Sequence, residues 1–331
     1  MDRTIGTVRP GKGPYLEDDP GLVHGPQGLR HAGRPSVAQT EHARVVAISP
    51  DVPEEAPRVP LPIGEVGVSR KTVWIDLPEG RIPFDADISV NLPADCRGIH
   101  MSRIEEAVSE LHSVSFPDPG AYAERLARLV SRTQRGDEVK VRIAGRMPVL
   151  RQTAVSGRPS VDTVRIHASC SLAVTEKGHQ EDTRIGLAVH HITACPCTQV
   201  YARTLCGGFD TPLPYPTHSQ RSETRIEVGR TGNIPCYEDL MECLEMALHV
   251  TQDLLKRPDE AEIVMKSHRA PQFAEDAVRE VAREAGLRLG GRLPGSTPVI
   301  IESTSLESIH IHDVRCRMET TLACILDALS A

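Results

Sequence analysis

The chain has 331 residues, enough to bury one large hydrophobic core or two modest ones. Its formal net charge of −7 argues against non-specific nucleic-acid binding, and aromatic residues at 3% leave few platforms for stacking bases. No apolar run reaches the roughly 18 residues of a membrane-spanning helix. Because the start lacks the apolar segment of a signal peptide, we expect a cytoplasmic protein whose nine cysteines are reduced.

The first segment, residues 1–58, is rich in Gly, Pro, Asp, Arg and His and has no sustained hydrophobic periodicity. Such a segment buries too little apolar surface to offset its ordering entropy. We therefore expect residues 1–58 to be a disordered extension, with only Ala43 to Ile48 able to form a short strand.

The pattern changes from Ile63 onward. Two β-rich runs, 66–77 and 81–92, flank the turn Pro78-Glu79-Gly80 and predict a hairpin. Ser102 to Glu105 reads as a capping box that opens a helix, and Pro119 opens a second one. Three strands are predicted next, at 139–150, 163–175 and 183–193.

A similar order of elements then returns. The second series comprises a strand at 222–229, helices at 237–256 and 272–285, and closing strands at 297–303 and 309–322. Strands in groups, with helices between the groups, predict an α+β fold of two tandem ββααββ-like modules. We place them at about 59–193 and 194–331, with antiparallel sheets covered by helices on one face. The free sheet edges need partners, so we expect a homo-oligomer.

The turn Cys195-Pro196-Cys197 places two thiols close together, and His218 follows after a loop rich in Gly and Pro. A thiolate and an imidazole brought together suit a borderline-soft divalent metal. The alternative is that the cysteines are small hydrophobic side chains of a stiff turn, since Cys is often buried for packing alone.

Six short motifs occur in a fixed order along more than half of the chain. They are Gly98-Ile99-His100-Met101-Ser102-Arg103, Cys195-Pro196-Cys197, Thr217-His218-Ser219-Gln220-Arg221-Ser222, Lys256-Arg257-Pro258-Asp259-Glu260, Phe273-Ala274-Glu275-Asp276 and Glu307-Ser308-Ile309-His310-Ile311-His312. This succession resembles the metal-dependent GTP cyclohydrolase I type B family, over roughly residues 60 to 328.

The resemblance implies a tunnelling fold for residues 59–331, a tetramer, and a hydrolase acting on cyclic amidines. Such an enzyme opens the GTP purine ring at C8, releases formate and yields 7,8-dihydroneopterin triphosphate, the first step of pterin and folate biosynthesis. The segment between Cys197 and His218 is longer than in typical bacterial members, so the archaeal product, 7,8-dihydroneopterin 2′,3′-cyclic phosphate, is an alternative. A non-catalytic purine- or pterin-binding protein is a third possibility.

The resemblance assigns the metal to Cys195, His218 and Glu260, the last expected at the end of a helix. Mixed S, N and O ligands allow iron(II), manganese(II) or zinc(II), and iron(II) is the metal that we expect to be bound. Without the resemblance, Glu260 would be read as a solvated side chain beside Pro258. Cys197 assists proton transfer, is an oxidation-sensitive neighbour, or is a small buried residue of the turn.

Glu275 is the implied anchor for the guanine edge of GTP, although a helical Glu near an N-terminus is also favoured by the helix dipole alone. His310 and His312 alternate along a predicted strand, so both should point to one face. The resemblance favours acid–base catalysis by this pair; an exposed strand face is the alternative.

The triphosphate of GTP needs basic partners. Arg103, His100 and Arg221 lie inside the motifs and are the implied substrate-binding residues. Lys266, His268 and Arg269 are further candidates, although any single arginine is more often part of a surface ion pair.

Overall fold

The computed structural model describes residues 36–176, 178–208, 212–231 and 235–330. The chain divides into two compact units, residues 1–51 and 52–331. In the first unit, α1 (Gln39–Ile48) is a helix with no buried side chain, so the short strand expected at 43–48 is wrong. An ion pair between Arg44 and Glu41, three residues apart at 2.6 Å, stabilises this helix. The disorder expected for residues 1–35 concerns a segment outside the described residues.

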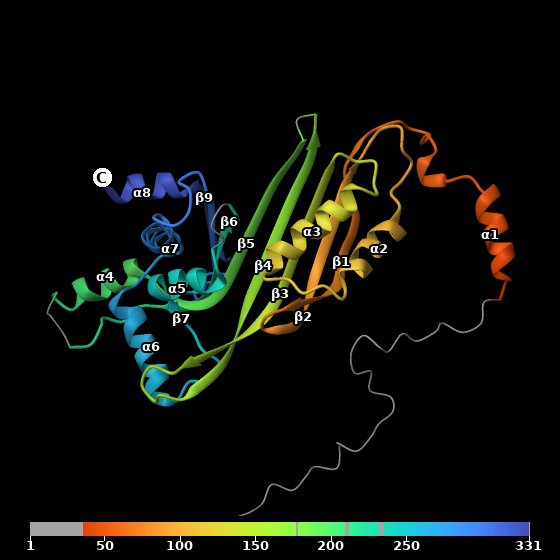
Figure 1. The fold of residues 1–331 in the computed structure, drawn as a ribbon. Coiled ribbons are helices and arrows are strands. Elements are labelled where there is room, and N and C mark those ends of the chain that lie inside the picture. Colours follow the sequence, from red (N-terminus) through yellow and green to blue (C-terminus); the bar gives the residue numbers. More distant parts are fainter. Residues whose placement is uncertain (1–35, 177, 209–211, 232–234, 331) are drawn as a thin grey trace, which may run out of the picture. The chain divides into compact units, whose positions relative to one another are not determined.

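The second unit begins with a short 3-10 helix, η1 (Val52–Glu54), and a first module of four strands and two helices (Figure 1). The elements of this module are β1 (Ile63–Leu77), β2 (Gly80–Leu92), α2 (Met101–Leu111), α3 (Pro119–Ser131), β3 (Glu138–Gln152) and β4 (Pro159–Thr175). Pro119 at the start of α3, with the Asp118 side chain accepting the Ala121 N–H at 2.9 Å, begins the helix as the sequence predicts.

The second module, which we begin at β5 rather than at residue 194, repeats this order with additional helices. It comprises β5 (Gly178–Ala194), α4 (Pro196–Leu205), β6 (Ser219–Gly229), α5 (Tyr237–Ala247), β7 (His249–Val250), α6 (Arg257–Arg269), α7 (Ala274–Leu289), β8 (Pro298–Ser305), β9 (Val314–Thr321) and α8 (Leu322–Ser330). The described strands form one antiparallel sheet in the order β1-β2-β3-β4-β5-β6-β8-β9, with β7 paired to β5. The predicted α+β chain with two ββααββ modules, the arrangement of a tunnelling fold, is confirmed.

One face of this sheet carries the hydrophobic core. Ile185 and Leu187 on β5 lie opposite Val228 and Ile226 on β6, and all four side chains are buried. Because strand side chains alternate, these residues share one face, against which α3, α5 and α7 pack. The opposite face is charged and hollowed by a cavity of about 790 Å³, whose lining includes Arg142, Arg165, Arg184 and Arg225. Helices α3, α5 and α7 thus cover the core face of the sheet.

Three helix boundaries differ from the sequence prediction, and one of them is the end of α7, which was expected at residue 285 and lies at Leu289. The helix expected over 237–256 ends at Ala247, because the chain turns into β7, which pairs with His191 and Ile192 of β5. Strand pairing there replaces the backbone hydrogen bonds that a longer helix would have made. The predicted capping box at Ser102 is also wrong: the N-cap residue of α2 is His100, which places Ser102 inside the helix.

Candidate active site

Cys195 and His218 come together at the end of the β5–β6 ladder. The last paired residues are Ala194 and Ser219, and one step further the Cys195 N–H donates to the His218 carbonyl at 3.0 Å. Opposed residues of an antiparallel pair have Cβ atoms about 5 Å apart and point to the same face. The sheet therefore joins the backbones of Cys195 and His218, the two residues of the predicted thiol–imidazole pair, at its end.

The core face becomes polar close to this pair. Six hydroxyl or imidazole side chains are fully or almost fully buried there: His191 and Thr193 on β5, Ser222 and Thr224 on β6, and Ser303 and Ser305 on β8. Thr224 lies 2.8 Å from both His191 Nε2 and Ser303 Oγ, while Thr193 lies 2.8 Å from Ser222 Oγ. These contacts cross three strands, so they fix the strand ends against one another beneath the site.

The polar network continues to the ring of His218. His218 Nδ1 lies 3.1 Å from Gln220 Oε1, and the Gln220 amide nitrogen donates to Ser305 Oγ at 3.3 Å and to Glu307 Oε1 at 3.2 Å. Ser305 also donates to Glu307 at 2.9 Å. The segment after β8 thus reaches the imidazole, and Ser308 Oγ lies 3.5 Å from the same Nδ1.

His191 is a buried imidazole within this polar band. Burial, and next the charge of His249, lowers the pKa of His191 to about 3. In the unfolded chain the pKa lies near 6.5, so the folded state binds fewer protons between these values. Above about pH 6.5 the ring is neutral in both states and does not lower the free energy of unfolding. As the pH falls below that value, the unfolded chain takes up a proton that the folded chain does not, so the free energy of unfolding falls progressively.

We expect His191→Gln to reduce the acid sensitivity of the fold, because an uncharged amide has no proton to gain. Below about pH 6, wild-type stability should fall more steeply than that of the variant, by about 1.4 kcal/mol per pH unit. Urea unfolding at several pH values measures this difference. His190→Gln, on the exposed opposite face, is the matched control. Parallel pH curves for wild type and His191→Gln would contradict the prediction.

Helix α4 begins directly after Cys195, which is its N-cap, so the Cys-Pro-Cys turn is the first turn of a helix. Cys197 is exposed in this turn, which contradicts the alternative that it is a buried residue of the turn. Gln199 on this helix donates to the carbonyl of Tyr215 at 3.3 Å and to that of His268 on α6. A cavity of about 260 Å³ lies between these elements, and its lining includes Arg203, His268 and Arg269.

Glu260 is exposed in the first turn of α6, not at the end of a helix as expected. It lies eight residues before His268, which corresponds to about 12 Å along a helix axis. Asp259 beside it is buried and accepts hydrogen bonds from the backbone of Val155 and Ser156, which fixes the start of α6 on the β3–β4 turn.

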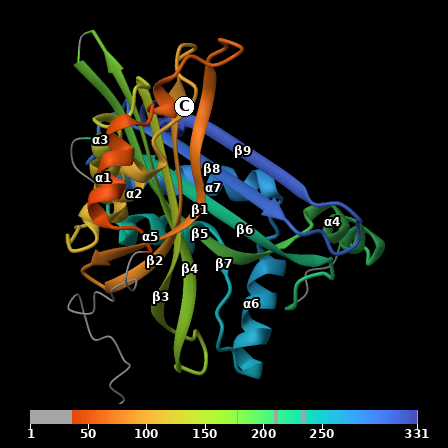
Figure 2. The same cartoon turned by 90° about the vertical axis from the view of Figure 1, so that its right-hand side faces the viewer.

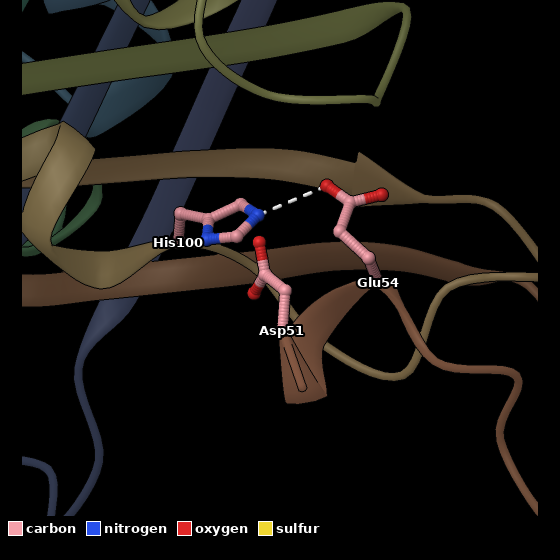
Figure 3. Close-up of side chains that lie close together, drawn as sticks. All are labelled: Asp51, Glu54 and His100. Atoms are coloured by element: carbon pink, nitrogen blue, oxygen red, sulfur yellow. Dashed lines mark hydrogen bonds and ion pairs between the residues drawn. The ribbon is translucent and has the colours of Figure 1, made fainter. Parts of the chain in front are cut away.

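Glu54 and His100, both in the second unit, form another pair of possible metal ligands, which includes none of Cys195, His218 and Glu260. His100 Nε2 lies 2.9 Å from Glu54 Oε1 (Figure 3).

His310 and His312 lie in the connection between β8 and β9, because the strand expected over 309–322 begins only at Val314. The β8–β9 ladder ends at the pair Ser305 and Val314, which leaves residues 306–313 without ladder partners. Both histidines are exposed, and their rings stack with centroids 5.4 Å apart. Figure 2 shows this connection and α4 at the same end of the sheet.

The anchor candidate Glu275 is exposed in the first turn of α7. Burial, and next the charge of Glu275, raises the pKa of the Cys316 thiol on β9. Arg221 is exposed on β6, and strand alternation puts it on the face opposite His218.

Two predicted substrate-binding residues belong to the first module. Arg103 donates to the Thr133 carbonyl at 3.0 Å, and the carbonyl of His100 accepts a hydrogen bond from Gln134 at 3.0 Å. Thr133 and Gln134 lie between α3 and β3 of the same module. The sheet brings together Cys195, His218 and the segment after β8, whereas Arg103 and His100 sit at the start of α2.

Sequence reasoning assigned no role to Gln220 or Glu307, although both lie inside the quoted motifs. The signal was present in the alternation of His218, Gln220, Ser222 and Thr224 along one strand face, which is polar where a core face is usually apolar. A polar run on a buried face implies mutual hydrogen bonding.

No helix in the described parts of the chain combines the length and apolar character needed to cross a membrane.

Residues 49–316 match the family described as Type I GTP cyclohydrolase folE2. The chain is 29% identical over 308 residues to GTP cyclohydrolase MptA of Methanospirillum hungatei, covering 85% of this chain and 93% of that protein. It is 31% identical over 275 residues to GTP cyclohydrolase MptA of Aeropyrum pernix, covering 80% and 93%.

A uricase from Bacillus fastidious superposes with a TM-score of 0.49 at 8% identity, covering 81% of this chain and 96% of that one. The family match extends over most of the chain and includes the Cys-Pro-Cys turn, His218, Glu260 and Glu275. The chain therefore belongs to the type I GTP cyclohydrolase family described as folE2.

Proposed function

We propose that this chain is a GTP cyclohydrolase that opens the purine ring of GTP hydrolytically at C8 and releases formate. The observation that carries the proposal is the pairing of Cys195 with His218 at the end of β5 and β6, within the span that matches the family. Anaerobic incubation with GTP and iron(II), manganese(II) or zinc(II), followed by formate assay and mass analysis of the pterin, tests it directly.

The donors at this position fit a divalent metal. Thiolate sulfur and imidazole nitrogen are ligands that zinc and iron(II) accept, and His218 binds Gln220 through Nδ1, which leaves Nε2 for a metal. We propose Cys195 and His218 as two ligands and Glu260 as the third. A bound metal would act as a Lewis acid and make water a better nucleophile at neutral pH.

The substrate would be recognised at its two ends. The Glu275 carboxylate can accept hydrogen bonds from the N–H edge of guanine, an edge that adenine does not offer. The cavity lined by Arg203, His268 and Arg269 lies next to α4 and would receive the triphosphate, since guanidinium groups bind phosphate in a bidentate manner. His310 and His312, on the segment that follows Glu307, would move protons during ring opening.

We propose 7,8-dihydroneopterin triphosphate as the product. The cyclic phosphate is the second candidate, because α4 and the segment up to His218 extend the border of the site and because the relatives described above are named MptA. Formation of a cyclic phosphate expels pyrophosphate, whereas the triphosphate product keeps all three phosphates. A pyrophosphate assay beside the mass measurement distinguishes the two.

We propose that the active form is a homo-oligomer, with a tetramer as the expected state. β1 and β9 end the strand order of the sheet, and each has an edge available for a partner. Helix α4 exposes Val200, Tyr201 and Leu205 and buries no side chain, which favours cover by another subunit. Arg103 lies in the first module and His218 in the second, so one chain need not supply both to one site.

Mixing inactive Arg103→Ala and His218→Ala subunits should restore part of the activity, because some hybrid interfaces would carry both native residues. Turnover of GTP after co-refolding, compared with each variant alone, is the measurement. Native mass spectrometry verifies that hybrids form. Hybrids that form and remain inactive would contradict the shared-site arrangement, as would a stable monomer with wild-type turnover.

A further inference from the structure

The contacts behind His218 determine which nitrogen of its ring carries the hydrogen. An ionised carboxylate such as that of Glu307 only accepts hydrogen bonds. Its oxygen Oε1 lies 3.2 Å from the Gln220 amide nitrogen and 2.9 Å from the Ser305 hydroxyl, so both neighbours donate to it. Glu307 thereby holds the NH₂ end of the Gln220 amide toward β8.

The opposite end of the same amide is then fixed. With its nitrogen toward Glu307, Gln220 presents its carbonyl oxygen to His218 Nδ1 at 3.1 Å. A carbonyl oxygen only accepts, so Nδ1 must carry the hydrogen and Nε2 keeps its lone pair. Ser308, 3.5 Å from Nδ1, fits either arrangement because a hydroxyl can donate or accept.

The surroundings make this orientation rigid. Ser305 is buried, and its hydroxyl both accepts from Gln220 at 3.3 Å and donates to Glu307. Thr193, also buried, lies 3.5 Å from the Ser305 hydroxyl and 2.8 Å from that of Ser222. The amide of Gln220 therefore cannot turn without breaking its hydrogen bonds to His218, Ser305 and Glu307.

We propose that Glu307, acting through Gln220, fixes His218 in the Nδ1–H tautomer and thereby presents Nε2 as a metal ligand. The tautomer itself follows from the hydrogen bonds of the metal-free chain; only its use by a metal rests on the proposed function. Glu307 and Gln220 are positioning residues, comparable to the carboxylates that orient metal-ligating histidines through the second ring nitrogen.

The test is nitrogen-15 NMR of histidine-labelled, metal-free protein at about pH 8, above the usual imidazole pKa. His218→Ala identifies the His218 signals. In wild type, Nδ1 should show the shift of a protonated nitrogen and Nε2 that of an unprotonated one. In Glu307→Gln the new amide can donate or accept, so Gln220 is free to turn and the Nδ1–H preference should fall.

Binding of zinc(II) alone to the metal-free proteins gives the second readout. Glu307→Gln should weaken zinc binding by about 10–100-fold, the usual effect of losing such a partner. Glu319→Gln, which makes the same change in an exposed carboxylate that pairs with Arg317 on β9, should retain both the tautomer and the affinity and is the matched control. Gln220→Met removes the amide at similar volume and should behave like Glu307→Gln.

An Nε2–H tautomer in the wild-type protein would overturn the inference, even if no variant folds and even if the enzyme turns over GTP. Unchanged tautomer and zinc affinity in a folded Glu307→Gln variant would overturn it as well. An Nδ1–H tautomer in a protein that never consumes GTP would reject the proposed function and leave the tautomer assignment intact.

Discussion

Replacing His218 by alanine is expected to remove bound metal and to lower GTP turnover by more than about 100-fold. This loss exceeds the one that usually follows when a residue hydrogen-bonded to a metal ligand is replaced. Cys195→Ala should have the same effect, since both side chains leave the same end of the β5–β6 ladder. The fold should survive, because both residues are partly exposed at strand ends and outside the hydrophobic core. Metal analysis of the purified variants is the measurement, with GTP turnover beside it.

The matched controls use residues of the same types nearby. Cys206→Ala changes an exposed cysteine at the other end of α4, and His190→Ala changes an exposed histidine on the opposite face of β5. Both should keep metal and activity. Full metal occupancy in Cys195→Ala and His218→Ala would remove both residues from the metal site.

Glu275→Gln is expected to keep the metal and to weaken GTP binding. An amide places a donor where the guanine edge also donates, and such a mismatch costs about 1–3 kcal/mol. This cost corresponds to roughly 5–150-fold in affinity. Binding of GTP to the metal-free variant, measured by calorimetry, separates recognition from catalysis.

Glu280→Gln is the matched control, since Glu280 lies on the same helix and pairs with Arg283 at the surface. It should leave GTP affinity unchanged. If Glu275→Gln loses metal and keeps GTP affinity, the assignments of Glu275 and Glu260 must be exchanged.

The sequence by itself determined much of the architecture, because local patterns carry it. Alternating runs predicted the β1–β2 hairpin, and Pro119 predicted the start of α3, since turn and cap chemistry acts over a few residues. The six motifs also selected the correct family, which most of the chain matches.

Only the tertiary structure decided features that depend on distant partners. The helix at Tyr237 stops early because β5 offers backbone partners to β7, and His310 and His312 leave the strand because the β8–β9 ladder ends before them. Both outcomes are set by hydrogen bonds between segments far apart in sequence. The secondary-structure propensity of a segment carries no information about such distant partners.

The same holds at the candidate site. The sequence singled out Cys195 and His218 by residue type and spacing, and the register of β5 against β6 joined their backbones. The role of Gln220 and Glu307 became visible only with β8 beside β6. These residues are 87 apart in sequence, and the orientation of the Gln220 amide is set by its hydrogen bond to the Glu307 carboxylate. Residue type supplied the chemistry of the site, and strand register decided which groups meet.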